Sequence, residues 1–95
     1  MAKEVQIIKV AADSNVKSVA GSISHALKGD DNVGAKNVEI LAIGAGAVNQ
    51  AFKACAISSG HLANYGETLI IRPGFKVSEI NGEEKTIMRF IVSTI

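Results

Sequence analysis

Asn81 and Gly82 stand between two stretches that are rich in β-branched residues and suit β-strands. Asn-Gly is the preferred pair for a two-residue type I′ turn, because both central residues of that turn need a positive φ. The pair therefore predicts an antiparallel hairpin. A two-residue turn also sets the register of the hairpin and so assigns every side chain of both strands to one face.

The predicted register separates the hairpin into an apolar and a basic side. The apolar side is expected to face the core, and it pairs Val77 with Thr86, Phe75 with Met88, Pro73 with Phe90, and Ile71 with Val92. The opposite side pairs Ser78 with Lys85, Lys76 with Ile87, Gly74 with Arg89, and Arg72 with Ile91. Four basic residues would then share an exposed face. A bulge at Pro73-Gly74 would instead shift one strand and scatter them.

The rest of the chain alternates strand and helix patterns. Strands are expected over residues 4–12, 37–43, 67–73 and 85–94. Helices are expected over 16–28 and 47–59, with Gly29 after the first and a polar loop to Lys36. Each helix has one main apolar stripe, and the first two strands are joined through a helix, as parallel neighbours are. These patterns predict a two-layer α/β sandwich of order β-α-β-α-β-β, with a mixed four-stranded sheet and both helices on one face.

Composition limits the classes of function. The chain has 95 residues, which suits one domain, 1–95, and 47% of them are apolar. One cysteine excludes a disulfide framework or a four-cysteine zinc site, and no apolar run approaches a membrane span. The N-terminus shows no signal-peptide pattern, which predicts a cytoplasmic location. A net charge of +1 gives no bulk electrostatic reason for binding nucleic acid.

Gly44-Ala45-Gly46 is predicted to form a tight turn before the second helix. Backbone N–H groups at a helix N-terminus favour an anion, although the glycines could serve only to turn the chain sharply against a neighbouring strand. The segment is no dinucleotide fingerprint, because Asn49 stands where the third glycine belongs. Polar side chains follow the turn and could extend an anion site: Asn49, Gln50 and Lys53.

The second helix also carries a second, small-apolar face, formed by Ala47, Ala54 and Ile57. On the sheet, Ile70, Ile87 and Ile91 are expected among the exposed side chains. A monomer would leave this apolar surface in water, so we expect self-association as a homodimer or a higher oligomer.

No catalytic or metal-binding arrangement is predicted. Cys55 lies on the buried stripe of the second helix, and the two histidines, His25 on a polar helix face and His61 in a loop, lack metal-ligand spacing. Asp30 and Asp31 have no nearby base candidate. The sequence thus predicts a non-enzymatic protein without a cofactor. The remaining acids flank the hairpin turn as a solvated tip: Glu79, Glu83 and Glu84.

Residues 43–57, IGAGAVNQAFKACAI, closely resemble the signature of the stage V sporulation protein S family. Three more stretches agree in order: residues 16–21 (VKSVAG), 71–75 (IRPGF) and 80–86 (INGEEKT). The main departure is the loop over 29–36, which is longer and more polar than is usual. The resemblance implies a role in sporulation or a related developmental process, and an Alba-like fold.

Alba-like proteins are dimeric nucleic-acid binders, so the resemblance also implies a DNA or RNA partner. Two positions that are basic in Alba proteins are Gly46 and Gln50 here, and the hairpin tip is acidic rather than basic. Phe52, Phe75 and Phe90 are expected to be buried, which would leave Tyr65 for base stacking.

Three hypotheses follow. The first is a regulator that binds nucleic acid through phosphates at the glycine turn and the basic hairpin face. The second is a protein–protein interaction module that assembles through its apolar surfaces, and the third is a binder of a small anion or metabolite.

Overall fold

The computed structural model describes residues 6–28 and 37–95. Six elements follow in the predicted order: β1 (Gln6–Val10), α1 (Val16–Lys28), β2 (Val38–Ala42), α2 (Ala45–Ala63), β3 (Leu69–Ile80) and β4 (Glu83–Thr94). The expectations for residues 4–5, for Gly29 and for the loop that holds Asp30 and Asp31 lie outside the described residues.

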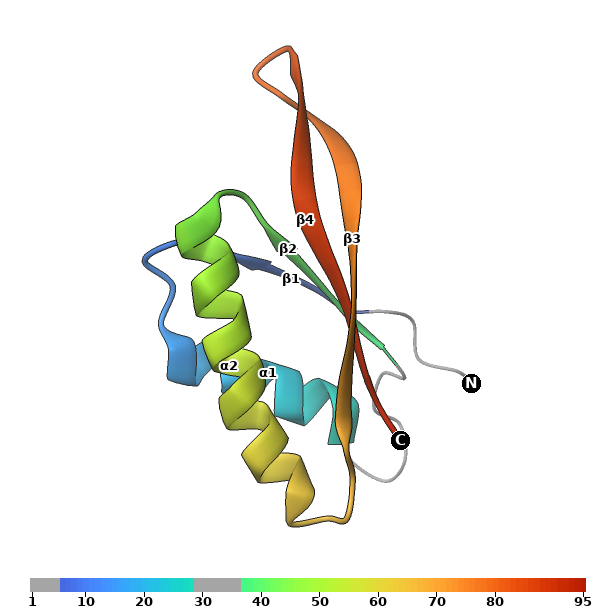
Figure 1. The fold of residues 1–95 in the computed structure, drawn as a ribbon. Coiled ribbons are helices and arrows are strands. Elements are labelled where there is room, and N and C mark those ends of the chain that lie inside the picture. The colour runs from blue at the N-terminus through green and yellow to red at the C-terminus, as the bar shows by residue number, and fades with distance from the viewer. Residues whose placement is uncertain (1–5, 29–36) are drawn as a thin grey trace.

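The sheet is mixed and four-stranded, in the order β1-β2-β4-β3. β1 and β2 pair in parallel, and both other pairings are antiparallel. Both helices lie on one side of this sheet and pack against each other (Figure 1). The predicted fold class is therefore confirmed.

The hairpin has the predicted register. Phe75 pairs with Met88 and Arg72 with Ile91, without a bulge at Pro73-Gly74. Asn81 and Gly82 have φ values of 53° and 80°, so both occupy the left-handed region that the turn requires. β3 is longer than expected and runs on to Ile80, because the pairing extends up to the turn itself.

The core lies between the sheet and the helices. β2 is buried along its whole length, and the largest fully buried side chains include Phe90, Ile23, Ile40 and Leu62. In α1 the predicted stripe is buried, and the Asn15 side chain accepts a hydrogen bond of 2.9 Å from the Ser18 N–H at the helix start.

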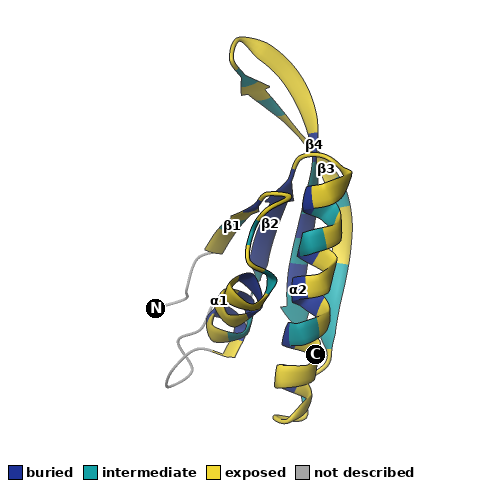
Figure 2. Ribbon diagram, turned by 90° about the vertical axis from the view of Figure 1, so that its left-hand side faces the viewer, coloured by how far each residue is buried: buried dark blue, intermediate teal, exposed yellow. Residues whose placement is uncertain are grey.

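The end of the hairpin, residues 75–86, projects beyond the helices, and we call it the arm (Figure 2). Phe75 and Val77 were expected in the core, but they are 72% and 62% exposed. Their face of the sheet is the predicted one, yet the helical layer ends before it reaches them. Ile87 differs in the opposite sense, because it was expected to be exposed and is buried at the base of the arm.

The second helix begins and ends outside the predicted bounds of 47–59. Gly44 is its N-cap, so Ala45 and Gly46 form its first turn rather than a separate loop. Of the expected self-association face, Ala47 and Ala54 belong to the core, and Ile57 is partly buried and packs against it. Phe52, expected on the buried stripe, is 45% exposed and its ring packs on Phe90 with the centroids 5.0 Å apart.

Candidate nucleic-acid interface

The helices leave one side of the sheet uncovered, and we call it the open face. Its side chains alternate along each strand with those of the core. The register brings basic residues of neighbouring strands onto it beside one acid: Lys9 of β1, Glu39 of β2, Arg72 and Lys76 of β3, and Arg89 of β4.

Glu39 organises the charges of this face. Its carboxylate is buried and forms ion pairs with two cations. Arg89 Nη2 lies 3.3 Å from Oε1, and Lys76 Nζ lies 3.8 Å from Oε2. A buried carboxylate needs such partners, because its desolvation is costly. Glu39 is not among the residues predicted for the site. A signal was present, since Glu39 is the one charged residue in the strand Val38–Ala42.

The four predicted basic residues therefore differ in their freedom to bind an anion. Lys76 and Arg89 both form ion pairs with Glu39. Lys85 Nζ lies 3.7 Å from Oε1 of Glu83 at the exposed end of the arm. Arg72 is exposed and forms no ion pair with any residue that the structure describes. Among the described residues, Nε of Arg89 is buried and has no hydrogen-bond partner.

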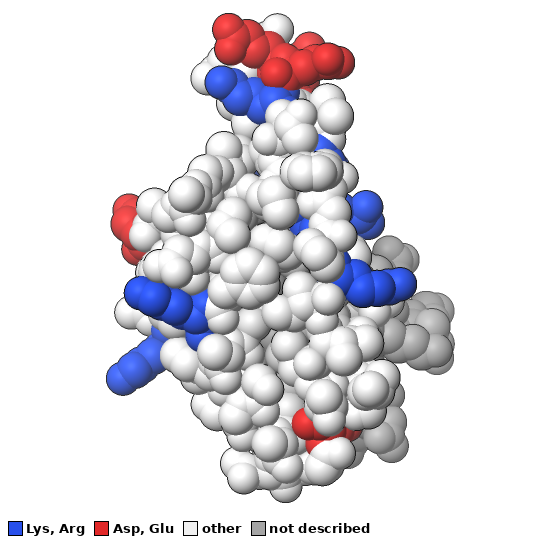
Figure 3. All heavy atoms as spheres, viewed as in Figure 1, with Lys and Arg blue, Asp and Glu red and all other residues white. Residues whose placement is uncertain are grey.

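Charges of opposite sign separate along the arm. Acidic side chains gather at its end, and basic ones lie below them toward the sheet (Figure 3). The tip carries Glu79 opposite Glu84, and Glu83 beside them, so a phosphate backbone would be repelled there. The part of the open face with excess positive charge is thus the sheet itself rather than the tip.

The glycines before α2 have a structural role of their own. Gly44 has φ 89° and ψ 159°, a conformation that is almost restricted to glycine. A Cβ on Gly46 would lie 3.0 Å from Cβ of Ala12, so glycine permits close packing of α2 on the loop after β1. Gln50 joins the same contact, because its Nε2 donates a 2.9 Å hydrogen bond to the carbonyl of Ser14.

The structure divides the predicted site between two surfaces. Gly44, Ala45, Gly46, Asn49 and Lys53 are exposed at or near the start of α2, in the helical layer. The predicted basic stripe extends from the sheet onto the arm on the open face. The two groups therefore lie in different layers of the fold.

Exposed aromatic residues are more numerous than expected. Of the three phenylalanines only Phe90 is buried, and Tyr65 is exposed as well. Lys28 holds Tyr65 by donating a 2.7 Å hydrogen bond to its hydroxyl and by lying 4.2 Å from the ring centroid. Phe52 of α2 and Phe75 and Val77 of the arm are exposed toward the helical side of the sheet, and we call these three side chains the apolar surface.

The cysteine and one histidine, Cys55 and His61, lie where the two helices pack together. Burial raises the pKa of the Cys55 thiol to about 11, so the thiol stays protonated near neutral pH. His61 lies in α2 rather than in a loop, and its Nδ1 is 3.0 Å from Oγ of Ser24, which is 2.7 Å from Oγ of Ser58. Within residues 6–28 and 37–95, no carboxylate orients His61 and no group of three acids, histidines or cysteines could hold a metal ion.

The order of the elements and the topology of the sheet define a small two-layer α/β fold, and this fold is similar to that of Alba. Alba from Thermoplasma volcanium is a structural match with a TM-score of 0.59 and 14% sequence identity, over 94% of this chain and 98% of that one. The family model described as "Stage V sporulation protein S (SpoVS)" matches residues 6–95. The chain therefore belongs to the stage V sporulation protein S family. In the part that the structure describes, no helix is both long and apolar enough to cross a bilayer.

Proposed function

We propose that this protein is a non-enzymatic regulator of sporulation or a related developmental process that binds DNA or RNA through phosphate contacts. In this proposal it acts in the cytoplasm as a homodimer of single-domain chains and needs no cofactor. Membership of the stage V sporulation protein S family supports a role in sporulation or a related developmental process. The Alba-like fold supports DNA or RNA as the partner only by analogy, because one fold hosts many functions.

The excess positive charge of the open face is the observation that carries the proposal. Arg72, Lys76 and Arg89 lie on the adjacent strands β3 and β4, and Glu39 of β2 pairs with two of them, Lys76 and Arg89. Phosphate groups bind to such cations with release of counterions, and backbone contacts of this kind carry no sequence information. We therefore expect weak binding without sequence preference.

The residues of the interface should contribute unequally. Arg72 pairs with no described carboxylate, so it can bind a phosphate without giving up an ion pair. Lys76 and Arg89 would have to share their charge between the ligand and Glu39. Lys85 should contribute least, because Glu83 lies beside it.

The surface at the start of α2 could provide a second contact with the same DNA or RNA strand. It offers the exposed Asn49 and Lys53 and the backbone of Gly44, Ala45 and Gly46. Gln50 is engaged with Ser14, so it should stabilise this surface rather than bind the ligand.

The test is a salt series of binding to labelled DNA and RNA oligonucleotides of unrelated sequence. Arg72→Gln should weaken binding to all of them alike and reduce the slope of log K against log salt by about 1. Lys17→Gln is the matched control, because Lys17 is exposed on α1, in the helical layer. Unchanged affinity and slope in Arg72→Gln would exclude the open face, and a loss confined to Lys53→Gln would place the contact at α2.

The alternative is an interaction module that binds no nucleic acid. The apolar surface of Phe52, Phe75 and Val77 favours it, since a contact made there would depend little on salt. Absence of binding to every oligonucleotide at low salt, together with self-association that salt does not weaken, would favour this alternative.

A further inference from the structure

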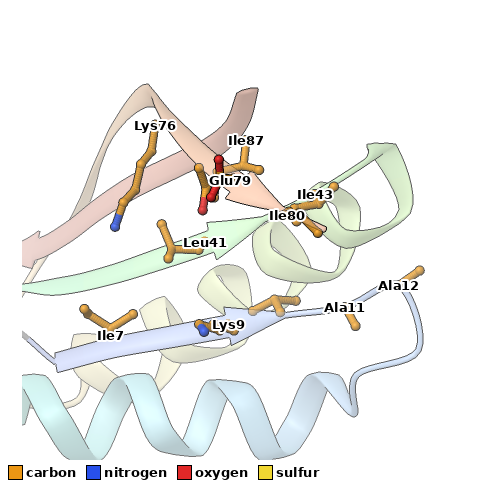
Figure 4. Close-up of a pocket in the computed structure, with 12 residues that line it drawn as sticks. Ile7, Lys9, Ala11, Ala12, Leu41, Ile43, Lys76, Glu79, Ile80 and Ile87 are labelled. Carbon is orange, nitrogen blue, oxygen red and sulfur yellow. The ribbon is translucent and has the colours of Figure 1, made fainter. Parts of the chain in front are cut away.

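The arm and the two N-terminal strands enclose a pocket of about 620 Å³ on the open face. Figure 4 shows Lys76 and Glu79 on the arm above Leu41 of β2, with Ile7 and Lys9 on β1 below. A pocket of this size lies within the range of roughly 300–1,000 Å³ that is usual for small-molecule sites.

The lining of the pocket is mostly aliphatic. Leu41 and Ile87 are buried in its wall, whereas Ile7 and Ile43 are each 54% exposed and present apolar surface to the pocket. Ile80 of the arm lines the same pocket. Such a concave surface favours a ligand with an apolar body, because binding removes the aliphatic side chains from water.

The polar groups of the pocket carry excess positive charge. Lys9 forms no ion pair within the described part of the chain, and Lys76 shares Glu39 with Arg89. Glu79 is the acidic residue of the lining. Two lysines against one glutamate favour an anionic head group, and the position of Lys9 beside Leu41 in the register places the charge next to the apolar floor.

We propose that this pocket binds a small amphipathic carboxylate, with the aliphatic or aromatic body against Leu41, Ile43 and Ile87 and the carboxylate at Lys9. The proposal does not depend on nucleic-acid binding, and its test contains no nucleic acid. The ligand would lie beside Lys76, which is part of the candidate nucleic-acid interface.

The test is a titration of the isotope-labelled full-length protein with sodium octanoate, followed by NMR. Octanoate should shift the amide signals of β1, of the end of β2 and of the arm, with saturation at millimolar concentration. Acetate, which lacks the apolar body, and 1-octanol, which lacks the charge, should each bind more weakly. Octanol that binds as tightly as octanoate would overturn the proposed ligand class.

Charge variants test the position of the carboxylate. Lys9→Gln should weaken octanoate binding about fivefold, the upper end of the range for an exposed ion pair. Glu79→Gln should strengthen binding, because it removes a repulsive charge, and Lys17→Gln should leave it unchanged. All three side chains are exposed, so the fold should persist, and the NMR spectrum of each variant checks this.

Three further outcomes would overturn the proposal. The first is shifts that grow linearly without saturation. The second is an unchanged affinity in both the Lys9 and the Glu79 variants. The third is shifts centred on Phe52 and Phe75, which would mean nonspecific binding to the other apolar surface.

Discussion

At the scale of single residues, Glu39 decides how the charge of the open face is distributed. It is a buried acid in the centre of the sheet, and it takes up part of the charge of Lys76 and Arg89. Breaking a buried pair from one side leaves an uncompensated charge. Substitution of Lys76 or Arg89 removes one of the two cations that compensate Glu39, so we expect it to lower stability as well as change the interface, which makes Arg72 the sharper probe of binding.

Gly44 is a second residue whose role is local. Gly44→Ala should lower the free energy of unfolding by about 1–3 kcal/mol, because a side chain at φ 89° and ψ 159° is strained. Gly21→Ala is the control, since a Cβ there would meet nothing within 4 Å and should stabilise α1 by about 0.5–1 kcal/mol. Urea denaturation measures both. A Gly44 variant as stable as the original protein would show that the α2 start relaxes to another conformation.

At the scale of elements, the N-termini of the two helices are stabilised by different contacts. α1 is capped by the side chain of Asn15, whereas α2 begins at Gly44 without a side-chain cap and is tied through Gln50 to Ser14 in the loop between β1 and α1. The α2 start thus depends on a contact between segments far apart in the sequence, and α1 depends on a neighbour in the chain.

This difference gives a prediction for α1. Asn15→Ala should lower the free energy of unfolding by about 1 kcal/mol, because the Ser18 N–H loses its acceptor. Ser22→Ala, on the exposed face of the same helix, should change it by no more than a few tenths of a kcal/mol. Thermal denaturation followed by circular dichroism compares the two. Equal stability of both variants would contradict a capping role for Asn15.

At the scale of the whole molecule, the sheet separates a charged from an apolar surface. The open face carries the basic residues and the pocket, and the other side carries Phe52, Phe75 and Val77 between α2 and the arm. Contiguous exposed aromatic and aliphatic side chains are typical of association surfaces. Our expectation of a homodimer therefore shifts from Ala47 and Ala54, which are buried, to this apolar surface.

The prediction is that the protein sediments as a dimer at roughly ten micromolar and above. Phe75→Ser should shift the equilibrium to the monomer, because it removes the most exposed aromatic side chain of this surface. Ile95→Ser is the control, since Ile95 is equally exposed but lies at the C-terminus. Analytical ultracentrifugation checks the masses, and a monomeric original protein or a dimeric Phe75 variant would count against the surface.

Features that depend on near neighbours in the chain could be predicted from the sequence. Asn81-Gly82 set the register of the whole hairpin, because a type I′ turn fixes which residues face each other. The spacing of Val19, Ile23 and Ala26 likewise predicted the buried stripe of α1. The order of strands and helices followed from such local patterns, so the fold class was within reach of the sequence.

Only the tertiary structure decided which surfaces are covered and which charges are free. A strand's alternation assigns Phe75 to a face, but exposure depends on whether the helical layer extends over it, and it does not. The pairing of Arg89 with Glu39 joins two strands that are far apart in the sequence, so no local pattern of either segment indicates it. The candidate interface and the pocket depend on such long-range contacts, because burial and ion pairing are properties of the assembled layers rather than of any one segment.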